Sequence, residues 1–331
     1  MTNNGVGSRL KAQRGKALVG VDIGGTKTAV VISTDAPDIA WRKEFPTRPA
    51  EGPEHAIRSI LELAAQGLRE TDTRPLALGV SCGGPLDRVN GIIQRPPNLL
   101  TWDNVEIKKI LENTFAAPCH VENDANAGAI AEHCFGAGQG SMHMVFLTLG
   151  TGLGAGLILN GNIYHGANGM AGEIGHIRLS ESGPRGFGKS GSVEGWASGG
   201  GMAQRAHDLI RAAVGAGVHT SLASGATPVT ARDVGLALAE GDPVAERIVH
   251  ETGVRLGEAL AILIDLLNPE RIVLGGLALR LGESLLGPAR ARVQEEALQA
   301  SSNVCEIVPA ALGERIGDIA ALCVAMGLSN P

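Results

Sequence analysis

The segment ALVGVDIGGTKTAVVIS, residues 17–33, consists of two apolar, strand-like runs separated by a Gly-Gly turn, and this pattern predicts a β-hairpin. Gly24 and Gly25 allow the backbone to approach a phosphate closely and to adopt positive φ angles. Consecutive N–H groups at such a turn can form an anion-binding concavity, to which Thr26 adds a hydroxyl and Lys27 a cation. By itself the segment fits an ordinary hairpin equally well, and it is not a P-loop, because G-x-x-x-x-G-K-[ST] is absent.

A second segment of the same design follows about 130 residues later. In HMVFLTLGTGLGAGLILNGNIY, residues 143–164, the glycine turn that contains Gly150, Thr151 and Gly152 again separates two strand-like runs. Two such turns at matching places suggest two halves built on one plan. Together they predict two phosphate-gripping hairpins that face one another across a cleft, and they make two unrelated tight turns a much weaker interpretation.

Two aspartates in these and neighbouring segments are candidates for chemistry. Asp22, at the end of the first run, could hold a hydrated Mg²⁺ ion, because Mg²⁺ prefers few carboxylates plus water. Asp124 follows Glu122 and Asn123 at a predicted strand-to-helix junction, so its side chain would point into whatever cleft the strand ends line. A carboxylate there could act as general base for a hydroxyl that attacks a phosphoryl group. The alternative is a plain helix N-cap, formed by Asn123 or Asp124.

Polar residues in the Gly- and Ser-rich stretch 165–200 are candidates for binding a sugar. Glu173, His176 and, further along, Glu194 supply donors and acceptors for sugar hydroxyls. Loops of this length tend to be functional. The alternative is that these are ordinary surface residues on a long loop, and His176 alone would more often be structural.

Apolar periodicity places the remaining elements. Helices are expected at 54–70, 105–115, 124–136, 282–300 and 315–327, with a mostly helical region over 196–268 that breaks near 215–230 and 241–243. Strands are expected at 76–81, 118–122, 271–276 and 304–308. Gly275 and Gly276, at the end of the third of these strands, would let a flat adenine ring lie on the backbone. Because strands and helices alternate, the fold class is α/β.

Size and composition favour two domains in a soluble, cytoplasmic protein. A chain of 331 residues with 44% hydrophobic residues is long enough for its core to split in two. The net charge of -6, without a long run of either sign, shows no basic stripe for nucleic acid. Five scattered cysteines, never spaced C-x-x-C, suggest neither disulfides nor a cysteine zinc site. The N-terminus lacks the apolar core of a signal peptide, and no apolar run is long enough to span a membrane.

These segments together resemble the ROK family, which takes its name from repressors, open-reading-frame products and kinases. The run LVGVDIGGTKTAVVI resembles the family's first phosphate motif, and Gly83-Gly84-Pro85-Leu86-Asp87 resembles its G-P-[LV]-D turn. The runs VENDANAGAIAEHCFGAG and LGTGLGAGLILNGNIYHGANGMAGEIGH are close to the family signature, and NPERIVLGG resembles the strand on the adenosine side. The match covers nearly the whole chain, from about residue 17 to 327.

The resemblance implies an actin/hexokinase-like ATPase fold of the ribonuclease H-like type, with two α/β domains around a cleft that closes on sugar and ATP. After a disordered lead, 1–15, we expect a small N-terminal domain over 16–130 and a larger C-terminal domain over 131–314. The C-terminal helix, within 315–331, is a candidate to pack back onto the first domain. The usual reaction is transfer of the γ-phosphate of ATP to a hexose, commonly at its 6-hydroxyl.

The resemblance also implies roles for individual residues. Asp124 would be the catalytic base, and magnesium would accompany the nucleotide. The residues expected to contact the sugar are Gly84, Asn98, Asn123, Glu173, His176 and Glu194. The residues expected at the nucleotide are Asp22, Gly24, Gly25, Thr26, Lys27, Gly150, Thr151, Gly152, Gly275 and Gly276.

One segment departs from the family pattern. After the E-x-G-H element, members usually carry C-x-C-G-x-x-G-C-x-E, which binds structural zinc together with the histidine. Here Arg185, Phe187 and Ser192 stand at the cysteine positions. Because neither Arg nor Phe can ligate zinc, we expect no zinc in this protein. His176 would then serve the sugar alone, and Phe187 would pack where the metal otherwise holds the loop.

Several alternatives stay open at this point. The sugar can be glucose, N-acetylmannosamine, N-acetylglucosamine, fructose, allose or a modified sugar, and the phosphate donor can be ATP or polyphosphate. The main rival to a kinase is a non-catalytic sugar sensor on the same scaffold, although Asp124 and Thr26 are both retained. Repressor members carry an extra N-terminal winged helix-turn-helix, and only about 15 residues precede the first strand here, so we expect no DNA binding. Family members are often dimers or tetramers, and a homo-oligomer is expected.

Overall fold

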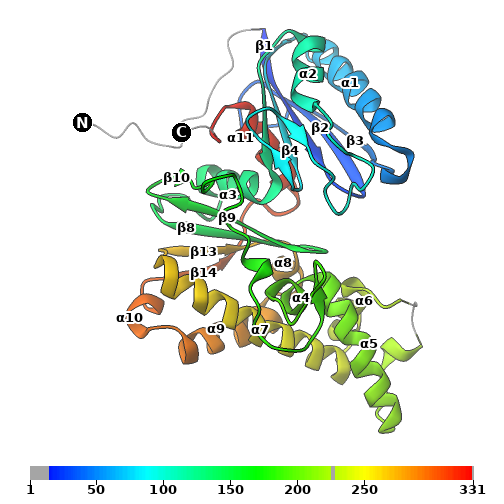
Figure 1. Cartoon of the computed structure of the whole chain (residues 1–331), viewed down its shortest axis with the longest axis vertical. Helices are drawn as coiled ribbons and strands as arrows, with labels where there is room; N and C mark the ends of the chain where they lie inside the picture. The colour runs from blue at the N-terminus through cyan, green and yellow to red at the C-terminus, as the bar shows by residue number, and fades with distance from the viewer. Residues whose placement is uncertain (1–14, 225–227, 330–331) are drawn as a thin grey trace. The chain divides into compact units, whose positions relative to one another are not determined.

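The computed structural model describes residues 15–224 and 228–329, and within them the chain forms two compact units. The first unit contains the described residues of 1–140, 162–169 and 312–331, and the second contains those of 141–161 and 170–311. The lead expected over 1–15 lies outside the described residues, except for Gly15. The chain returns to the first unit at Leu312, so its C-terminal helix belongs to that unit (Figure 1).

The first unit is built on a five-stranded sheet in the order β3-β2-β1-β4-β7. Its strands are β1 (Lys16–Ile23), β2 (Lys27–Ser33), β3 (Trp41–Pro46), β4 (Arg74–Cys82) and β7 (Cys119–Asn123). Strands β1, β2 and β3 pair antiparallel, which confirms the hairpin predicted for 17–33. Strands β1, β4 and β7 run parallel, so their carboxyl ends lie at the same edge of the sheet.

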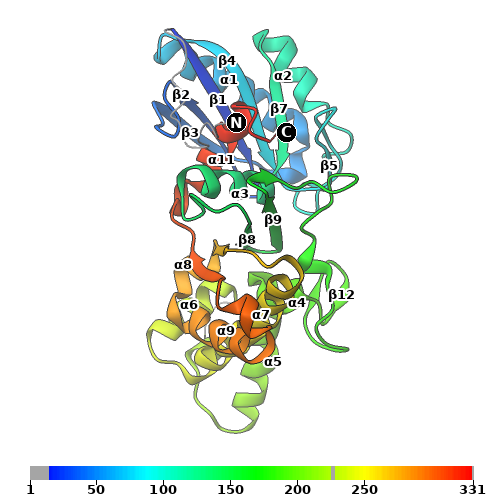
Figure 2. The same ribbon diagram turned by 90° about the vertical axis from the view of Figure 1, so that its left-hand side faces the viewer.

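Helices cover both faces of this sheet (Figures 1 and 2). They are α1 (Pro53–Glu70), α2 (Ile107–Phe115), α3 (Asp124–Phe135) and α11 (Ile316–Ala325), and the shorter elements are η1 (Pro49–Glu51), β5 (Leu86–Asp87), β6 (Ile92–Ile93), β10 (Asn162–Ile163) and η4 (Gly313–Arg315). Ile60 of α1 packs into the core on one face, and Leu322 and Ala325 of α11 pack on the other. Gly79 of β4 permits this close packing, because a Cβ there would fall on the backbone of α11.

The second unit repeats the plan of a hairpin joined to parallel strands. Its strands are β8 (Met144–Leu149), β9 (Leu153–Leu159), β13 (Arg271–Leu274) and β14 (Glu306–Pro309). Strands β8 and β9 pair antiparallel, as predicted, and β8, β13 and β14 run parallel. Its longer helices are α5 (Gly199–Gly215), α6 (Ala231–Ala239), α7 (Pro243–Leu267) and α9 (Glu283–Glu296), with the short η3 (Ser221–Ala223), α8 (Leu277–Leu281) and α10 (Gln299–Ser302). Apolar residues of α7 and α9 share one core with the sheet.

Several segments differ from the sequence prediction, which did not include β3, β5 and β6. The stretch 165–200, expected as a long loop, contains η2 (Ile174–His176), β11 (Arg185–Gly186), β12 (Lys189–Ser190) and α4 (Val193–Ala197). These elements are too short to show an apolar period. The helix expected at 282–300 ends at Glu296, because Ala297 has an extended backbone, and α10 begins separately.

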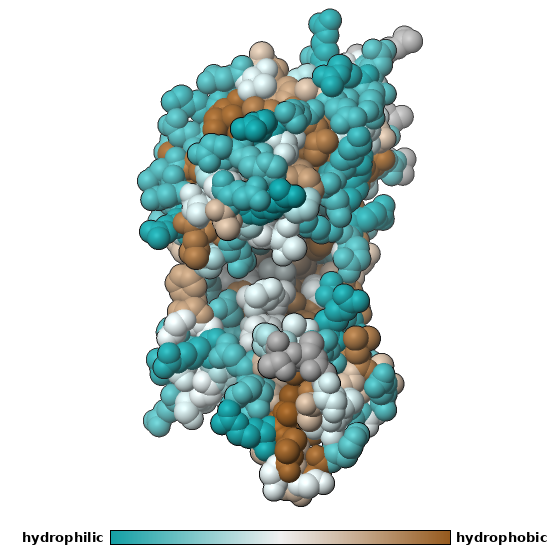
Figure 3. Space-filling view, turned by 90° about the vertical axis from the view of Figure 1, so that its right-hand side faces the viewer, coloured by the Kyte–Doolittle hydropathy of each residue, from teal (hydrophilic) through white to brown (hydrophobic). Residues whose placement is uncertain are grey.

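Most of the surface drawn in Figure 3 is hydrophilic, and hydrophobic residues there form small, separate patches. The exposed large apolar side chains, such as Val89, Phe187 and Leu266, are spread along the chain. Scattered apolar residues of this kind are normal on protein surfaces. Across the part of the chain that the structure describes, no helix has both the length and the apolarity that crossing a bilayer requires.

Candidate active site

The carboxyl ends of the parallel strands in the first unit bring predicted site residues together. Strand pairing places Asp22 of β1 opposite Ser81 of β4, and Ser81 opposite Glu122 of β7. Asn123 ends β7 and Asp124 begins α3, one and two positions beyond this row. In α/β folds, ligands commonly bind just outside such strand ends.

The predicted phosphate turn between β1 and β2 is held in one shape by its neighbours. The hydroxyl of Thr47 donates to the carbonyl of Gly24 (2.7 Å), and its amide donates to the carbonyl of Thr26 (3.0 Å). A Cβ at Gly25 would lie 2.7 Å from the Cβ of Asn98, which is closer than side chains can pack. Gly25 therefore has to be glycine, and the turn lies directly against Asn98, which the sequence assigns to the sugar.

Charged side chains beside this turn form a chain of ion pairs. The ammonium of Lys27 lies 3.1 Å from Glu44, and both side chains are largely exposed. Arg42 joins Glu44 (2.7 Å) to Asp318 (2.7 Å), and Asp318 is buried in α11. Exposed ion pairs contribute little free energy. Lys27 can therefore leave Glu44 for a phosphate at a small cost in free energy. The buried carboxylate of Asp318, in contrast, needs Arg42 as its ion-pair partner.

The carboxyl group of Asp22 has an unusual electrostatic environment. Burial raises the pKa of Asp22 to about 7, and the negative charges of Asp124 and Asp318 act in the same direction. A hydrogen bond from Ser81 and the charge of Lys27 oppose this rise. Near neutral pH, Asp22 is therefore partly protonated, and a cation bound beside it would favour the ionised form.

Asn123 and Asp124 have separate roles at the start of α3. The side-chain oxygen of Asn123 accepts hydrogen bonds from the amides of Ala125 (2.9 Å) and Asn126 (3.4 Å), so Asn123 is the N-cap. Asp124 is exposed, and one of its oxygens accepts from the amide of Ala125 (2.8 Å). The protein packed around the Asp124 carboxyl still raises its pKa, against backbone hydrogen bonds that lower it. Since Asn123 already caps the helix, the Asp124 carboxylate is available for chemistry.

The chain after β4 approaches both of these side chains. A Cβ at Gly84 would lie 3.2 Å from the side-chain nitrogen of Asn123, and a Cβ at Gly83 would lie 3.9 Å from a carboxylate oxygen of Asp124. The first unit thus gathers the phosphate turn, the predicted base and three predicted sugar contacts around one strand edge.

In the second unit, the turn between β8 and β9 is held by the N-terminus of α5. The amides of Gly199 and Gly200 donate to the carbonyls of Gly150 (2.7 Å) and Thr151 (3.0 Å), and the amide of Gly150 donates to the carbonyl of Gly152 (3.0 Å). These bonds satisfy the carbonyl groups of the turn and fix its shape, which a preorganised phosphate site requires.

Glu194 connects this turn to the segment that the sequence assigns to the sugar. Its Oε2 accepts from the amide of Leu153 (3.1 Å), and a Cβ at Gly152 would lie 2.8 Å from the same oxygen. Its Cβ also lies 3.4 Å from the position of a Cβ at Gly175, in η2. Glu194 therefore supports the turn and also lies beside η2, the short helix that ends at His176.

Glu173 and His176 lie at the two ends of η2. The carboxylate of Glu173 is 3.7 Å from Nε2 of His176, and both side chains are about half exposed. The ring of Phe187 meets the His176 ring edge-on, with centroids 5.1 Å apart, and Lys189 donates to the His176 carbonyl (2.6 Å). Within residues 15–224 and 228–329, no group of three or more His, Cys, Asp or Glu side chains is arranged to hold a metal ion.

Gly275 and Gly276 follow β13 and lie against β8. The amide of Gly275 donates to the carbonyl of Leu147 (2.8 Å). Gly276 has a positive φ of 62°, and a Cβ there would collide with the carbonyl of Leu149, at the end of β8. The second unit therefore brings the two predicted nucleotide segments to the same strand end, next to the turn at Gly150.

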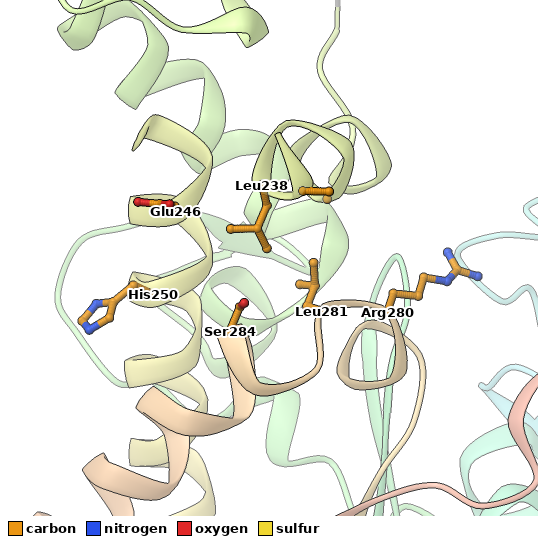
Figure 4. Close-up of a pocket in the computed structure, with 8 residues that line it drawn as sticks. Leu238, Glu246, His250, Arg280, Leu281 and Ser284 are labelled. Atoms are coloured by element: carbon orange, nitrogen blue, oxygen red, sulfur yellow. The ribbon is translucent and has the colours of Figure 1, made fainter. Parts of the chain in front are cut away.

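A separate hollow of about 510 Å³ lies among α6, α7, α8 and α9, and it contains none of the predicted site residues. In Figure 4, Leu238 and Leu281 face one another, whereas His250 and Arg280 point outward on opposite sides. Ligand sites usually need polar groups that converge on the ligand. We therefore assign no role to this hollow.

Some residues around the site were not identified from the sequence. Ser81 and Thr47 belong to no motif, and only the fold shows their contacts. Asp318 did carry a signal, because it is an acidic residue in an otherwise apolar, buried helix, and Glu122 is a buried acid of a short strand. An acid in such a position needs partners, and it can therefore mark a polar site.

The chain is similar to several known proteins. A family model described as the ROK family matches residues 18–327. The chain is 35% identical to a glucokinase from Halalkalibacterium halodurans, over 91% of this chain and 92% of the relative. It is 26% identical to a xylose repressor from Caldicellulosiruptor bescii, over 95% of this chain and 78% of the repressor. A solved ROK family glucokinase from Streptomyces griseus, in complex with glucose and AMPPNP, is similar with a TM-score of 0.79 and 31% identity, over 94% of this chain and 99% of that one. These likenesses confirm the predicted α/β, actin-like ATPase fold.

Proposed function

The chain belongs to the ROK family, and from this premise we propose that it is an ATP-dependent sugar kinase. In this proposal it phosphorylates a hexose or hexose derivative at the 6-hydroxyl, with Asp124 as the general base. The observation that carries the proposal is the end of β7, where Asn123 caps α3 and the exposed carboxylate of Asp124 stays available near Gly83. The glucokinases among the relatives support it.

Asp124 would accept the proton of the sugar hydroxyl as that oxygen attacks the γ-phosphorus of ATP. The raised pKa of Asp124 favours this role, because a general base works best when its pKa approaches the working pH. Lys27 and the N–H groups of the two glycine turns would stabilise negative charge on the transferred phosphoryl group. The fixed shapes of both turns mean that these groups need little rearrangement.

The surroundings of Asp22 fit a magnesium ion that arrives with the nucleotide. Repulsion from Asp124 and Asp318 raises the pKa of Asp22 in addition to burial, and a divalent cation would offset this repulsion. Mg²⁺ prefers carboxylate and water oxygens. Asp22 would therefore hold the ion, and the ion would supply neutralisation of the phosphate charge.

The sugar that we propose to test first is glucose, because glucokinases are among the relatives. The residues that would contact it are Gly84, Asn98, Asn123, Glu173, His176 and Glu194. Other hexoses belong in the same test, since sugar epimers differ only in the placement of hydroxyl groups that such residues bind.

We also propose that the protein works in the cytoplasm as a homo-oligomer, without a nucleic-acid or membrane partner. All five cysteines are free thiols, which suits a reducing compartment. Size-exclusion chromatography with light scattering measures the oligomeric state directly.

A coupled assay of ADP release against a panel of sugars tests the proposed activity. We expect sugar-dependent ADP release, and a parallel arm with polyphosphate identifies the alternative phosphate donor. The second candidate function is a non-catalytic sugar-binding regulator, which the similarity to a xylose repressor favours. Sugar binding without phosphate transfer from either donor would establish this second function and reject the kinase.

Asp124→Asn tests the base. The variant should bind sugar and nucleotide with nearly unchanged affinity, and it should lower kcat by about two orders of magnitude or more, because the amide cannot accept the proton. Asp72→Asn is a suitable control, since Asp72 is an exposed carboxylate of the same unit in the left-handed conformation that asparagine tolerates. Near-normal turnover in Asp124→Asn would remove Asp124 from the role of base.

A further inference from the structure

Glu122 is a buried carboxylate that the proposed mechanism does not use. It lies in β7 immediately before Asn123 and Asp124, and its side chain is 1% exposed. A buried charge is costly unless it is paired and hydrogen-bonded. The partners of Glu122 therefore indicate what the carboxylate does.

Both oxygens of Glu122 accept hydrogen bonds, and the donors come from separate segments of the first unit. Oε1 accepts from the backbone amide of Asn123 (2.9 Å) and from the side-chain amide of Asn126 (3.1 Å). Oε2 accepts from Nε2 of His165 (2.9 Å), and Nε of Arg88 lies 3.4 Å away. Four segments of the first unit thus converge on one carboxylate. They are the end of β7, the first turn of α3, the 162–169 segment and the β5–β6 connection.

This set of partners requires an ionised glutamate. Burial raises the pKa of Glu122, but the hydrogen bond and charge of His165, with the bonds from Asn126 and Asn123, lower the pKa by more. The Asn123 amide, the Asn126 side-chain amide and Arg88 can only donate, and an ionised carboxylate lets Nε2 of His165 donate as well, so that both oxygens of Glu122 accept. A glutamine would turn its NH₂ group towards donors on one side.

We propose that Glu122 is a positioning residue, which fixes the corner between β7 and α3 and thereby aims Asp124 and Asn123 at the sugar. The inference rests on the proposed kinase function and adds a residue to its machinery. The bond from the Asn123 amide holds the peptide next to the base, and the bond from Asn126 ties the first turn of α3 to the same carboxylate. Because displacing a catalytic group by about 1 Å can lower a rate about 100-fold, loss of this anchor acts on turnover although Glu122 does not touch the substrate.

Glu122→Gln in the full chain tests the proposal. The wild-type protein is assayed first, so that absence of sugar-dependent ADP release there counts against the kinase function and not against Glu122. In an active enzyme, Glu122→Gln should lower kcat about 10- to 100-fold and raise the KM for sugar by a smaller factor. A kcat within about twofold of wild type, in folded Glu122→Gln, would overturn the proposal.

Glu132→Gln is the matched control. Glu132 is also a buried glutamate of α3, but at the far end of the helix, where its oxygens accept from the backbone amides of Ala137 (2.7 Å) and Leu312 (2.9 Å). This variant should lose stability and keep kcat within about twofold of wild type. An equal loss of kcat in both variants would show that any damage to a buried glutamate of this region lowers turnover, and the positioning role would be rejected.

His165→Ala gives a second, milder perturbation, which also decides the matter if Glu122→Gln does not accumulate as folded protein. Removing this donor should lower kcat about 3- to 10-fold, and the double variant should be no slower than Glu122→Gln alone, because His165 acts through Glu122. The proposal would be contradicted if the losses of kcat in Glu122→Gln and His165→Ala were fully additive in the double variant. An unchanged kcat in His165→Ala would contradict it as well.

Discussion

Asp22 and Asp124 are aspartates of one site, but their surroundings suit them to different tasks. Asp22 is half-buried at the end of β1, and burial together with neighbouring negative charge raises its pKa to about 7. Asp124 is exposed at the first turn of α3, where a substrate hydroxyl can reach it. We therefore propose Asp22, whose charge is opposed by two neighbouring acids, as the partner for a cation, and Asp124 as the base.

The environment of Asp22 predicts an effect of pH on stability. The pKa of Asp22 is about 7 in the folded protein and 3.8 as an ordinary carboxyl, so the folded state binds more protons between these values. Asp22 therefore makes the wild type less stable as the pH rises from about 4 to about 7. Asp22→Asn removes this loss and should raise the free energy of unfolding at pH 8 by up to about 4 kcal/mol, with little change at pH 4.

Urea unfolding at both pH values measures this difference, with Asp72→Asn as the exposed control. A variant that is less stable than wild type at pH 8 would mean that the ionised form of Asp22 is stabilised in the folded protein, contrary to the environment described.

Among the elements, the chain between η2 and α4 is held by side-chain contacts. Gln204 of α5 accepts from the amide of Arg185 (2.9 Å) and donates to its carbonyl (2.9 Å), as a neighbouring strand would. The indole of Trp196 donates to the hydroxyl of Ser180 (2.8 Å). With the aromatic contact on His176, these interactions occupy the segment in which the resemblance places zinc ligands. Side chains can thus order this segment without a metal.

Two treatments test whether the segment is held in this way. A chelator should leave the melting temperature of the wild type unchanged, because none of these contacts needs a metal. Gln204→Ala should lower the free energy of unfolding by about 1 kcal/mol, since two hydrogen bonds to Arg185 are lost, and it should raise the KM for sugar more than it changes kcat.

Gln66→Ala is the control for this prediction, since Gln66 also makes a surface hydrogen bond, to Glu70 within α1 (2.6 Å), but lies in the other unit. A fall in melting temperature on chelation that added zinc reverses would show that the segment binds a metal.

Elements with a clear apolar period were predictable from the sequence, and very short elements held by side chains from elsewhere in the chain were not. The helix predicted at 54–70 is found at Pro53–Glu70, because Ile60, Ala64 and Leu68 mark its buried face. The strands β11 and β12 have two residues each and pair with one another over 185–190, and Gln204 of α5 bonds to Arg185 of β11 from outside this hairpin. No local pattern carries that information.

The same limit applies to the site. Asp124 and Asn123 stand in a motif, so residue types and order were enough to single them out. The partners of Glu122 lie 34 residues before it, at Arg88, and 43 after it, at His165. Only the folded chain shows that these groups meet, so the anchoring role of Glu122 could not be inferred from its position in the motif.

At the scale of the whole molecule, the first unit is complete only when both ends of the chain are present. Leu322 and Ala325 of α11 pack with Leu18 of β1 and Val31 of β2. The amide of Leu312 donates to Glu132 of α3, which ties the start of the returning chain to the same unit. The sheet that contains Asp22, and whose strand β7 leads into Asp124 of α3, is therefore covered on one face by α11.

Gly79→Ala tests this long-range packing. The added Cβ would fall on the carbonyl of Ala321 and the backbone of Ala325, and neither can move without displacing α11. Overpacking of this kind usually costs about 1–3 kcal/mol, and we expect the upper end because the obstacle is backbone. Gly287→Ala is the matched control, since its added Cβ meets nothing within 4 Å in α9 and should stabilise the helix by up to about 1 kcal/mol.

Fluorescence can follow the first unit alone in this experiment. Trp41 and Trp102 belong to the first unit and Trp196, the third tryptophan, to the second, so a Trp196→Phe background reports unfolding of the first unit. In that background Gly79→Ala should lower the denaturant midpoint and Gly287→Ala should not. An unchanged midpoint in Gly79→Ala would mean that α11 does not lie against β4 as described. The packing of α11 would then not explain how the first unit holds the strand edge at which Asp22 and Asp124 lie.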